Sequence, residues 1–285
     1  MEALFVRCYT THDARQSLDG GAGSAQNLST GKELKKLEMI TERLQALTRS
    51  LMKSRLSIVL FAILCASGAV HGQTQPKPPA TAADWIERGR IDTALGDLAA
   101  AIDDFDRAIK LEPSNALAFY GRGFAKYAKH DLDGAIADYS RSIDLNPTSS
   151  ETFFNRGLAK YDKGDKKGAM ADYTAAIQLN PQLAQAYNNR GIIKDEQGDH
   201  DGAISDYDNA AKLNPNDASI YNNRGCAKEL KGDLAGALGD YSRAIEINPK
   251  YADAFSNRSR VKLALGDKAG AAADLKSSKD LKPSA

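Results

Sequence analysis

The sequence predicts an all-α fold, an α-solenoid of six helix–turn–helix repeats that fills residues 82–285. Three observations predict it. The chain repeats itself every 34 residues without insertion or deletion, as YNNRGIIKDEQGD (187–199) and YNNRGCAKELKGD (221–233) show. Proline returns at one place in every period, and each period holds two stretches of helical periodicity. Self-similarity at a fixed period of this length indicates an array with one supersecondary unit per period.

The region before the repeats divides into three parts. Residues 1–51 show no core-forming pattern, and we expect an extension that is disordered or that comes from a misassigned start upstream of Met52. In residues 52–72, two cations precede a 15-residue apolar run and then small residues, which is typical of a secretory signal peptide. A proline-rich linker, 73–81, follows.

The location of the repeats depends on that apolar run, residues 56–70. Cleavage before Gln73 would release them outside the cytoplasm, as a periplasmic or secreted protein. An uncleaved segment would leave them anchored to a membrane, although the run is shorter than the ~20 residues of a spanning helix. A third interpretation is a cytoplasmic apolar segment.

Charge and cysteine usage exclude several classes of function. Lys+Arg number 38 and Asp+Glu 37, so no strong basic field favours nucleic acid. Cys8, Cys65 and Cys226 form no CxxC or Cys/His cluster, which argues against a zinc site and a disulfide framework. The repeats contain only two histidines, His130 and His200, and no glycine-rich phosphate loop. We therefore expect no catalytic residues, no metal and no cofactor.

Each repeat can be interpreted by position, counted from 1 to 34. Positions 1–14 have helical periodicity, position 15 is glycine in five repeats, and position 16 is always aspartate. Glycine ends a helix and aspartate caps the start of the next one, and proline at position 32 ends the second helix. The six repeats occupy residues 82–115, 116–149, 150–183, 184–217, 218–251 and 252–285.

If the chain folds back near position 15, positions that sum to about 30 face each other. The aromatic residue at position 4 would then face the one at position 24, as in Trp85 with Phe105. Positions 7 and 23, which sum to 30, hold arginine and aspartate in all six repeats. We expect structural ion pairs with half-buried charges rather than catalytic pairs, because a site repeated along a row has no unique cleft. The pairs are Arg88/Asp104, Arg122/Asp138, Arg156/Asp172, Arg190/Asp206, Arg224/Asp240 and Arg258/Asp274.

Six shared positions carry a family resemblance. An aromatic residue at 4, glycine at 8, alanine at 20, an aromatic residue at 24, alanine at 27 and proline at 32 resemble the tetratricopeptide repeat (TPR), over all of 82–285. The resemblance implies a right-handed solenoid whose first helices line a concave groove. Two departures stand out. Position 11, usually aromatic in the family, is lysine in five repeats, and position 24 of the last repeat is Leu275.

The resemblance also implies that positions 2, 5, 6, 9, 12 and 13 point into the groove. They are apolar in the early repeats and polar in the later ones, where asparagine recurs. Asparagine offers a donor and an acceptor to an extended peptide backbone. Alternatively, these asparagines bond neighbouring repeats and the tyrosines pack between them. The expected peptide-binding residues are Tyr120, Phe124, Tyr127, Phe154, Asn155, Leu158, Tyr161, Asn188, Asn189, Asn222, Asn223 and Asn257.

These observations predict a non-catalytic scaffold that binds a protein or peptide outside the cytoplasm. Acidic groove positions in the later repeats (Asp195, Glu196, Glu229) predict a partner with apolar residues at one end and basic ones at the other. One alternative is a structural module that assembles through its terminal helices, and another is an enzyme accessory with no chemistry of its own. A monomer is favoured, and light scattering at several concentrations would separate it from a self-assembling module.

Overall fold

The computed structural model describes residues 81–281, which belong to one compact unit of the chain. The expected N-terminal extension, the signal-like segment and residues 73–80 of the linker lie outside the described residues. Among the described helices, none combines the length and the apolar character that crossing a bilayer requires.

The described residues form twelve α-helices and no strand, which confirms the predicted all-α class. Each 34-residue period holds a first helix of 13 residues and a second of 14, as the sequence predicted. The helices are α4 Ala82–Ala94, α5 Leu98–Leu111, α6 Ala116–Ala128, α7 Leu132–Leu145, α8 Ser150–Asp162, α9 Lys166–Leu179, α10 Ala184–Glu196, α11 His200–Leu213, α12 Ala218–Leu230, α13 Leu234–Ile247, α14 Ala252–Ala264 and α15 Lys268–Leu281.

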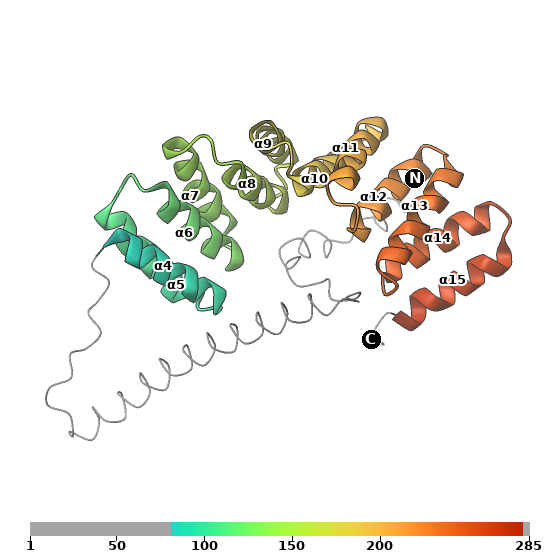
Figure 1. The fold of residues 1–285 in the computed structure, drawn as a ribbon, viewed down its shortest axis with the longest axis horizontal. Coiled ribbons are helices and arrows are strands. Elements are labelled where there is room, and N and C mark those ends of the chain that lie inside the picture. Colours follow the sequence, from blue (N-terminus) through green and yellow to red (C-terminus); the bar gives the residue numbers. More distant parts are fainter. Residues whose placement is uncertain (1–80, 282–285) are drawn as a thin grey trace, which may run out of the picture. The chain divides into compact units, whose positions relative to one another are not determined.

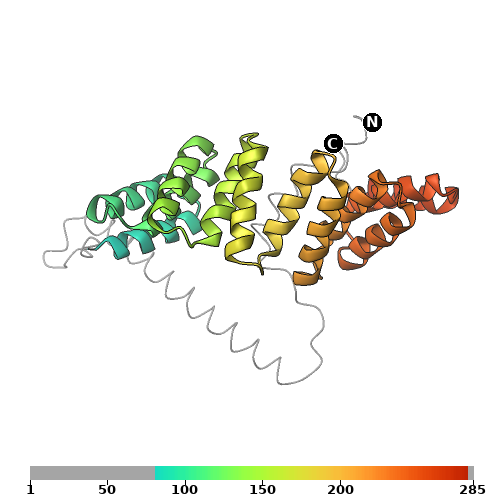
Figure 2. The ribbon, with the colours of Figure 1, turned by 90° about the horizontal axis from the view of Figure 1, so that it is seen from above.

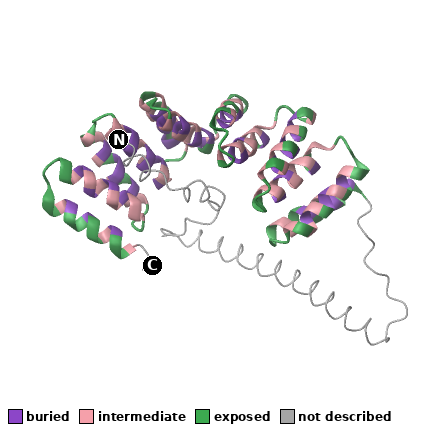
Figure 3. Cartoon of the chain, turned by 180° about the vertical axis from the view of Figure 1, so that it is seen from behind, coloured by how far each residue is buried: buried purple, intermediate pink, exposed green. Residues whose placement is uncertain are grey.

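The helices stack as a row of antiparallel pairs, with each repeat packed against the next (Figures 1 and 2). Each second helix contacts the first helix of the following repeat, as α5 contacts α6. First helices also contact one another, as in α4 with α6 and α12 with α14, whereas no two second helices in residues 81–281 make a comparable contact. The first helices therefore lie closer together and form the inner side of the row. The buried residues lie along the helix faces that meet (Figure 3).

The turn between the two helices follows the predicted stop and cap. The glycines at position 15 have φ between +80° and +92°, a left-handed conformation that a Cβ disfavours. His130 occupies this position in the second repeat at φ 66° and is the one non-glycine with positive φ among the described residues. The carboxylate at position 16 then accepts a bond from the backbone N–H three residues on, as Asp199 does from Gly202 at 2.9 Å.

The packing inside each pair differs from the expected alignment. The ring at position 24 lies on the glycine at position 8, so that a Cβ on Gly157 would sit 2.7 Å from Tyr173. The ring at position 4 packs instead with alanine at position 27, as Trp85 does with Ala108. The expected contact of position 4 with position 24 was wrong by about one helical turn. Large rings meet small residues here, which lets the two helix axes approach closely.

Candidate functional site

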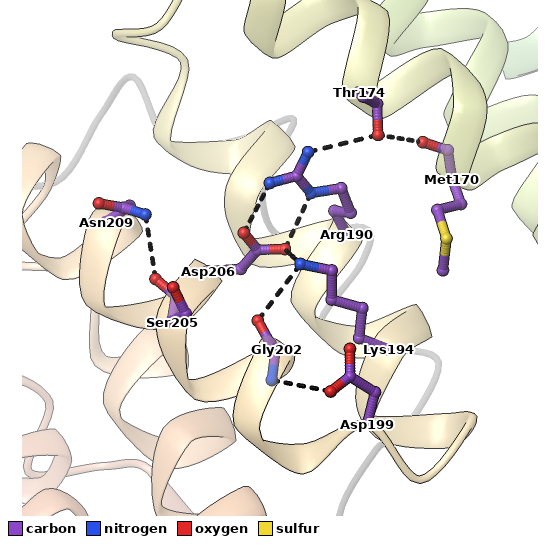
Figure 4. A network of polar contacts seen from close by, with 9 residues as sticks. All are labelled: Met170, Thr174, Arg190, Lys194, Asp199, Gly202, Ser205, Asp206 and Asn209. Carbon is purple, nitrogen blue, oxygen red and sulfur yellow. Dashed lines mark hydrogen bonds and ion pairs between the residues drawn. The ribbon is translucent and has the colours of Figure 1, made fainter.

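A bidentate ion pair joins position 7 to position 23 in every repeat. In the fourth repeat, Nε and Nη2 of Arg190 donate to the two carboxylate oxygens of Asp206 at 2.9 and 2.7 Å (Figure 4). Asp206 is 2% exposed, so the fork compensates a carboxylate removed from water. The other five pairs are Arg88/Asp104, Arg122/Asp138, Arg156/Asp172, Arg224/Asp240 and Arg258/Asp274.

The carboxylates of these pairs lie deeper than the sequence predicts. Half-buried charges were expected, but Asp138, Asp172 and Asp240 are buried, as Asp206 is. The arginines remain partly exposed, with 17–19% of the side chain open to solvent in Arg122, Arg156, Arg190, Arg224 and Arg258. Asp138, Asp172 and Asp240 were expected to be half-buried and are in fact buried.

Lysine at position 11 supplies a second cation to the same carboxylate. Lys194 Nζ lies 2.8 Å from Asp206 Oδ2, and the same contact recurs in the other four repeats that carry this lysine. This contact gives a physical reason for the departure from an aromatic residue at position 11. Burial raises the pKa of Asp274, but the bonds from Arg258 and Lys262 lower it further, so its pKa lies below the ordinary value.

The same arginines join neighbouring repeats. Nη1 of Arg190 donates to Thr174 Oγ1 of the preceding repeat at 3.3 Å, and Arg156 donates to Ser140 at 3.0 Å. Each guanidinium also lies over the aromatic ring at position 4, in Arg190 at 5.7 Å from the centroid of Tyr187. These arginines therefore stabilise the array, and we look for ligand contacts at other residues.

The asparagines expected to hold a ligand lie largely inside the array. Asn222 and Asn223 are 0% and 1% exposed, and Asn189 and Asn257 are also buried. Asn257 Nδ2 donates to Asn222 Oδ1 at 3.0 Å. These four asparagines were therefore wrongly assigned as peptide-binding residues. Neighbouring first helices approach so closely that they enclose the amides.

The bonds of these amides recur at three interfaces. A residue at position 5 of one repeat accepts from the asparagine at position 6 of the next, as Asn188 does from Asn223 at 3.2 Å and Tyr120 from Asn155 at 2.8 Å. Asn188 and Asn155 are partly exposed but are engaged in this way. Leu158 is likewise buried, packed with Tyr173, so its assignment to the groove surface is also corrected.

The acidic positions of the later repeats are already paired within the array. Glu229 accepts two bonds from Arg260, at 2.6 and 2.8 Å. Glu196 lies 3.2 Å from the Lys166 ammonium, and buried Asp195 contacts the His200 ring. These carboxylates do not provide the free negative charge from which a basic end of the partner was expected.

The apolar end of the first-helix face contains a pocket of about 490 Å³. We call it the first-interface pocket, because it opens between the first helices of repeats 1 and 2. Tyr120 and Phe124, both expected as peptide-binding residues, line it. The lining is completed by Ile86, Arg90, Thr93, Ala94, Phe105, Leu117, Gly121 and Glu151.

The aromatic residues of this face are partly exposed and anchored from behind. The Tyr120 ring lies 5.9 Å from that of Tyr139, and Phe154 lies 5.7 Å from Tyr173. Burial raises the pKa of Tyr120, so its phenol stays neutral at physiological pH. Further along, the Tyr127 hydroxyl donates to Asp162 at 2.7 Å and the Tyr161 hydroxyl to Glu196 at 2.9 Å. The expected aromatic residues thus form a row that begins at the pocket.

Comparison with known families agrees with this geometry. A family model described as "TPR repeat" matches residues 89–130, 125–164, 157–194 and 196–232, about half of the chain, and one described as "Tetratricopeptide repeat" matches 218–251. The chain belongs to the tetratricopeptide repeat family. No curated protein gave a significant match.

Several solved TPR structures are similar to the array. MamA is 28% identical over 57% of this chain and 96% of its own, with a TM-score of 0.54. YrrB, described as a TPR protein with an unusual peptide-binding site, is 21% identical over 63% and 92%, with a TM-score of 0.55. A TPR protein from Parabacteroides merdae ATCC 43184 is 20% identical over 86% and 92%, with a TM-score of 0.57. The last two likenesses show the fold alone.

TPR proteins generally serve as non-catalytic scaffolds that bind proteins or peptides. In residues 81–281 of this TPR chain, no three histidine, cysteine, aspartate or glutamate side chains gather where they could hold a metal ion. The first-interface pocket and the aromatic row beside it are the features suited to contact with another polypeptide.

Proposed function

We propose that this protein is an interaction scaffold, without catalytic activity of its own, that binds a peptide segment along its first helices. The observation that carries the proposal is the first-interface pocket, an open apolar hollow on the inner side of the row. Binding sites are usually concave and mostly apolar, with a few polar groups that orient the ligand.

The strength of binding would come from several weak contacts. A leucine side chain transferred from water into an apolar pocket gains about 1.5–3 kcal/mol, too little for stable capture alone. Tyr127, Phe154 and Tyr161 extend the apolar surface beyond the pocket and would contact neighbouring residues of the segment. YrrB, which has a similar fold, is described as a TPR protein with an unusual peptide-binding site, so peptide binding is known on this architecture.

We also propose that the scaffold works outside the cytoplasm, either released or anchored. The support is the order of charges, apolar run and small residues in 52–72, which is typical of an export signal. Fractionation of cells followed by immunodetection tests this proposal. Recovery of the protein only from the cytoplasm would contradict it.

Phe124→Ala tests the binding face. Phe124 lines the pocket and belongs to none of the buried core clusters, so its truncation should leave the helices intact. We expect cross-linked partner capture from the extracytoplasmic fraction to fall at least about tenfold, a loss of roughly 1.4 kcal/mol.

Leu263→Ala is the matched control. It removes a comparable apolar side chain that is 58% exposed on the first helix of the last repeat, far along the row from the pocket. Equal capture by wild type and Phe124→Ala, with equal circular dichroism, would exclude this face as the binding site.

A further inference from the structure

Four of the five interfaces between successive first helices share the same ring and the same residue at position 6, and the interface at one end of the row differs. We call each a rung: position 5 of one repeat and position 6 of the next meet beside the ring at position 24 of the earlier repeat. In the last four rungs the ring is tyrosine and position 6 is asparagine. These pairs are Tyr139/Asn155, Tyr173/Asn189, Tyr207/Asn223 and Tyr241/Asn257.

The first rung has lost both polar groups together. Its ring is Phe105, without the hydroxyl, and its position 6 is Gly121, without any side chain. Position 5 is Ile86, so the first rung is apolar throughout. The first rung therefore carries no polar side chain and gives the pocket an apolar floor.

At Gly121 the Phe105 ring takes the place of a side chain. A Cβ on Gly121 would lie 2.4 Å from the Phe105 ring, so the ring lies directly on the bare helix backbone. At the last rung Asn257 fills position 6 and is buried. Phe105 and Gly121 both line the first-interface pocket, so its floor is an aromatic ring beside an exposed stretch of backbone.

Two opposite charges flank the pocket along the row. Arg90 lies on α4, its side chain 73% exposed, with an exposed contact of 3.8 Å to Glu87. Glu151 lies at the start of α8, on the far side of α6 from Arg90, and is exposed. A ligand that enters the pocket therefore passes a cation on one side and a carboxylate on the other.

We infer that the first-interface pocket is the anchor site of the array, for an extended peptide with one large apolar residue between an acidic and a basic one. The apolar side chain packs on Phe105 and Gly121, while the acidic residue pairs with Arg90 and the basic one with Glu151. The inference rests on the proposed function. It adds where the peptide is anchored and which residue types the anchor requires. Phe105 and Gly121 set the specificity, because at the other rungs a tyrosine and an asparagine take the place of this apolar floor.

The experiment converts the first rung into a later one in the full chain. Phe105→Tyr with Gly121→Asn introduces a pair that the array uses four times, and the ring at 105 must move off residue 121 to admit the new side chain. The probes are fluorescent synthetic peptides with one leucine between an aspartate and a lysine, in both sequence orders, measured by anisotropy. We expect the double change to weaken binding at least about tenfold.

Matched changes accompany this variant. Ser256→Asn adds the same side chain to the first helix of the last repeat and should leave binding unchanged. Leu117→Lys alters the pocket wall at a residue that is 65% exposed, so it tests the site even if the double variant fails to fold. In the peptide, leucine to alanine should weaken binding as much as the double change does, and two like charges around leucine should weaken it less.

The outcomes separate the two proposals. Binding that survives the double change and Leu117→Lys but is lost in Phe154→Ala would overturn the anchor site and leave the proposed function standing. Cross-links that map only to second helices would overturn both. Failure of every leucine peptide to bind at concentrations up to about 1 mM, where even a 4 kcal/mol interaction is detectable, would overturn the anchor chemistry.

Discussion

At the scale of the residue, the aspartate at position 23 is the centre of each repeat. It is buried in all six repeats, and a buried carboxylate is stable only when it is well paired. The arginine fork gives it two bonds, and in five repeats lysine at position 11 gives a third contact. The third nitrogen of the arginine then reaches the preceding repeat, so one residue couples folding within a repeat to stacking between repeats.

This arrangement predicts an asymmetry between single and double changes at Arg190 and Asp206. Arg190→Met leaves the carboxylate buried with only Lys194, and we expect a loss of about 3 kcal/mol in unfolding free energy. Arg190→Met with Asp206→Leu removes both charges and should cost less than the single change. Urea denaturation followed by circular dichroism measures both.

Lys194→Met is the control for that comparison. It removes the more exposed cation and keeps the bidentate fork, so a loss of about 1 kcal/mol or less is expected. If the double variant is less stable than Arg190→Met, the pair contributes by its own attraction rather than by compensating a buried charge.

At the scale of the element, each helix pair is defined by its turn. Position 15 takes the left-handed conformation in every repeat, and five of the six repeats use glycine there. In the second repeat His130 adopts it at φ 66°, which a side chain makes unfavourable. The turn between α6 and α7 therefore carries a local cost that the other turns avoid.

His130→Gly should stabilise the protein. Removing the side chain relieves the left-handed strain, partly offset by the greater freedom of glycine in the unfolded chain, for a net gain of about 0.5–1 kcal/mol. Gly198→His makes the reverse change in the turn between α10 and α11 and should destabilise by a similar amount. Thermal melts decide the sign, and a lower melting temperature for His130→Gly would show that the histidine makes a compensating contact.

Sequence predicts these elements well because the signals that define them are local. The glycine, aspartate and proline at fixed positions give the helix ends, and arginine with aspartate gives the ion pair. Asn222 and Asn257 were wrongly predicted to face the groove, because a sequence pattern gives the type of a residue and not the direction of its side chain. Trp85 was aligned with Phe105 because the sum of positions locates a facing pair only to within about one helical turn. Gly121 was overlooked because repeats were compared for what they share.

At the scale of the whole molecule, the array is a one-dimensional system. Within residues 81–281, the extensive contacts of each helix pair are with its neighbours, and its first and second helices contact each other most extensively. Stability in such an array is approximately a sum of repeat and interface terms. Damage to a central repeat should therefore divide the array, while equal damage to a terminal repeat should only shorten it.

Gly191→Ala tests this property in the fourth repeat. An added Cβ would lie 2.8 Å from the ring of buried Tyr207, so either the ring or the helix must shift, at a cost of about 1–3 kcal/mol. We expect native-state hydrogen exchange to show α10 and α11 opening independently, with the repeats on either side keeping separate protection. Gly89→Ala brings a Cβ to 3.0 Å from Phe105 in the first repeat and should loosen only α4 and α5. One concerted loss of protection across residues 82–281 in both variants would mean that interfaces dominate over repeats. In that case binding at the first-interface pocket would stabilise the entire array rather than its first repeats.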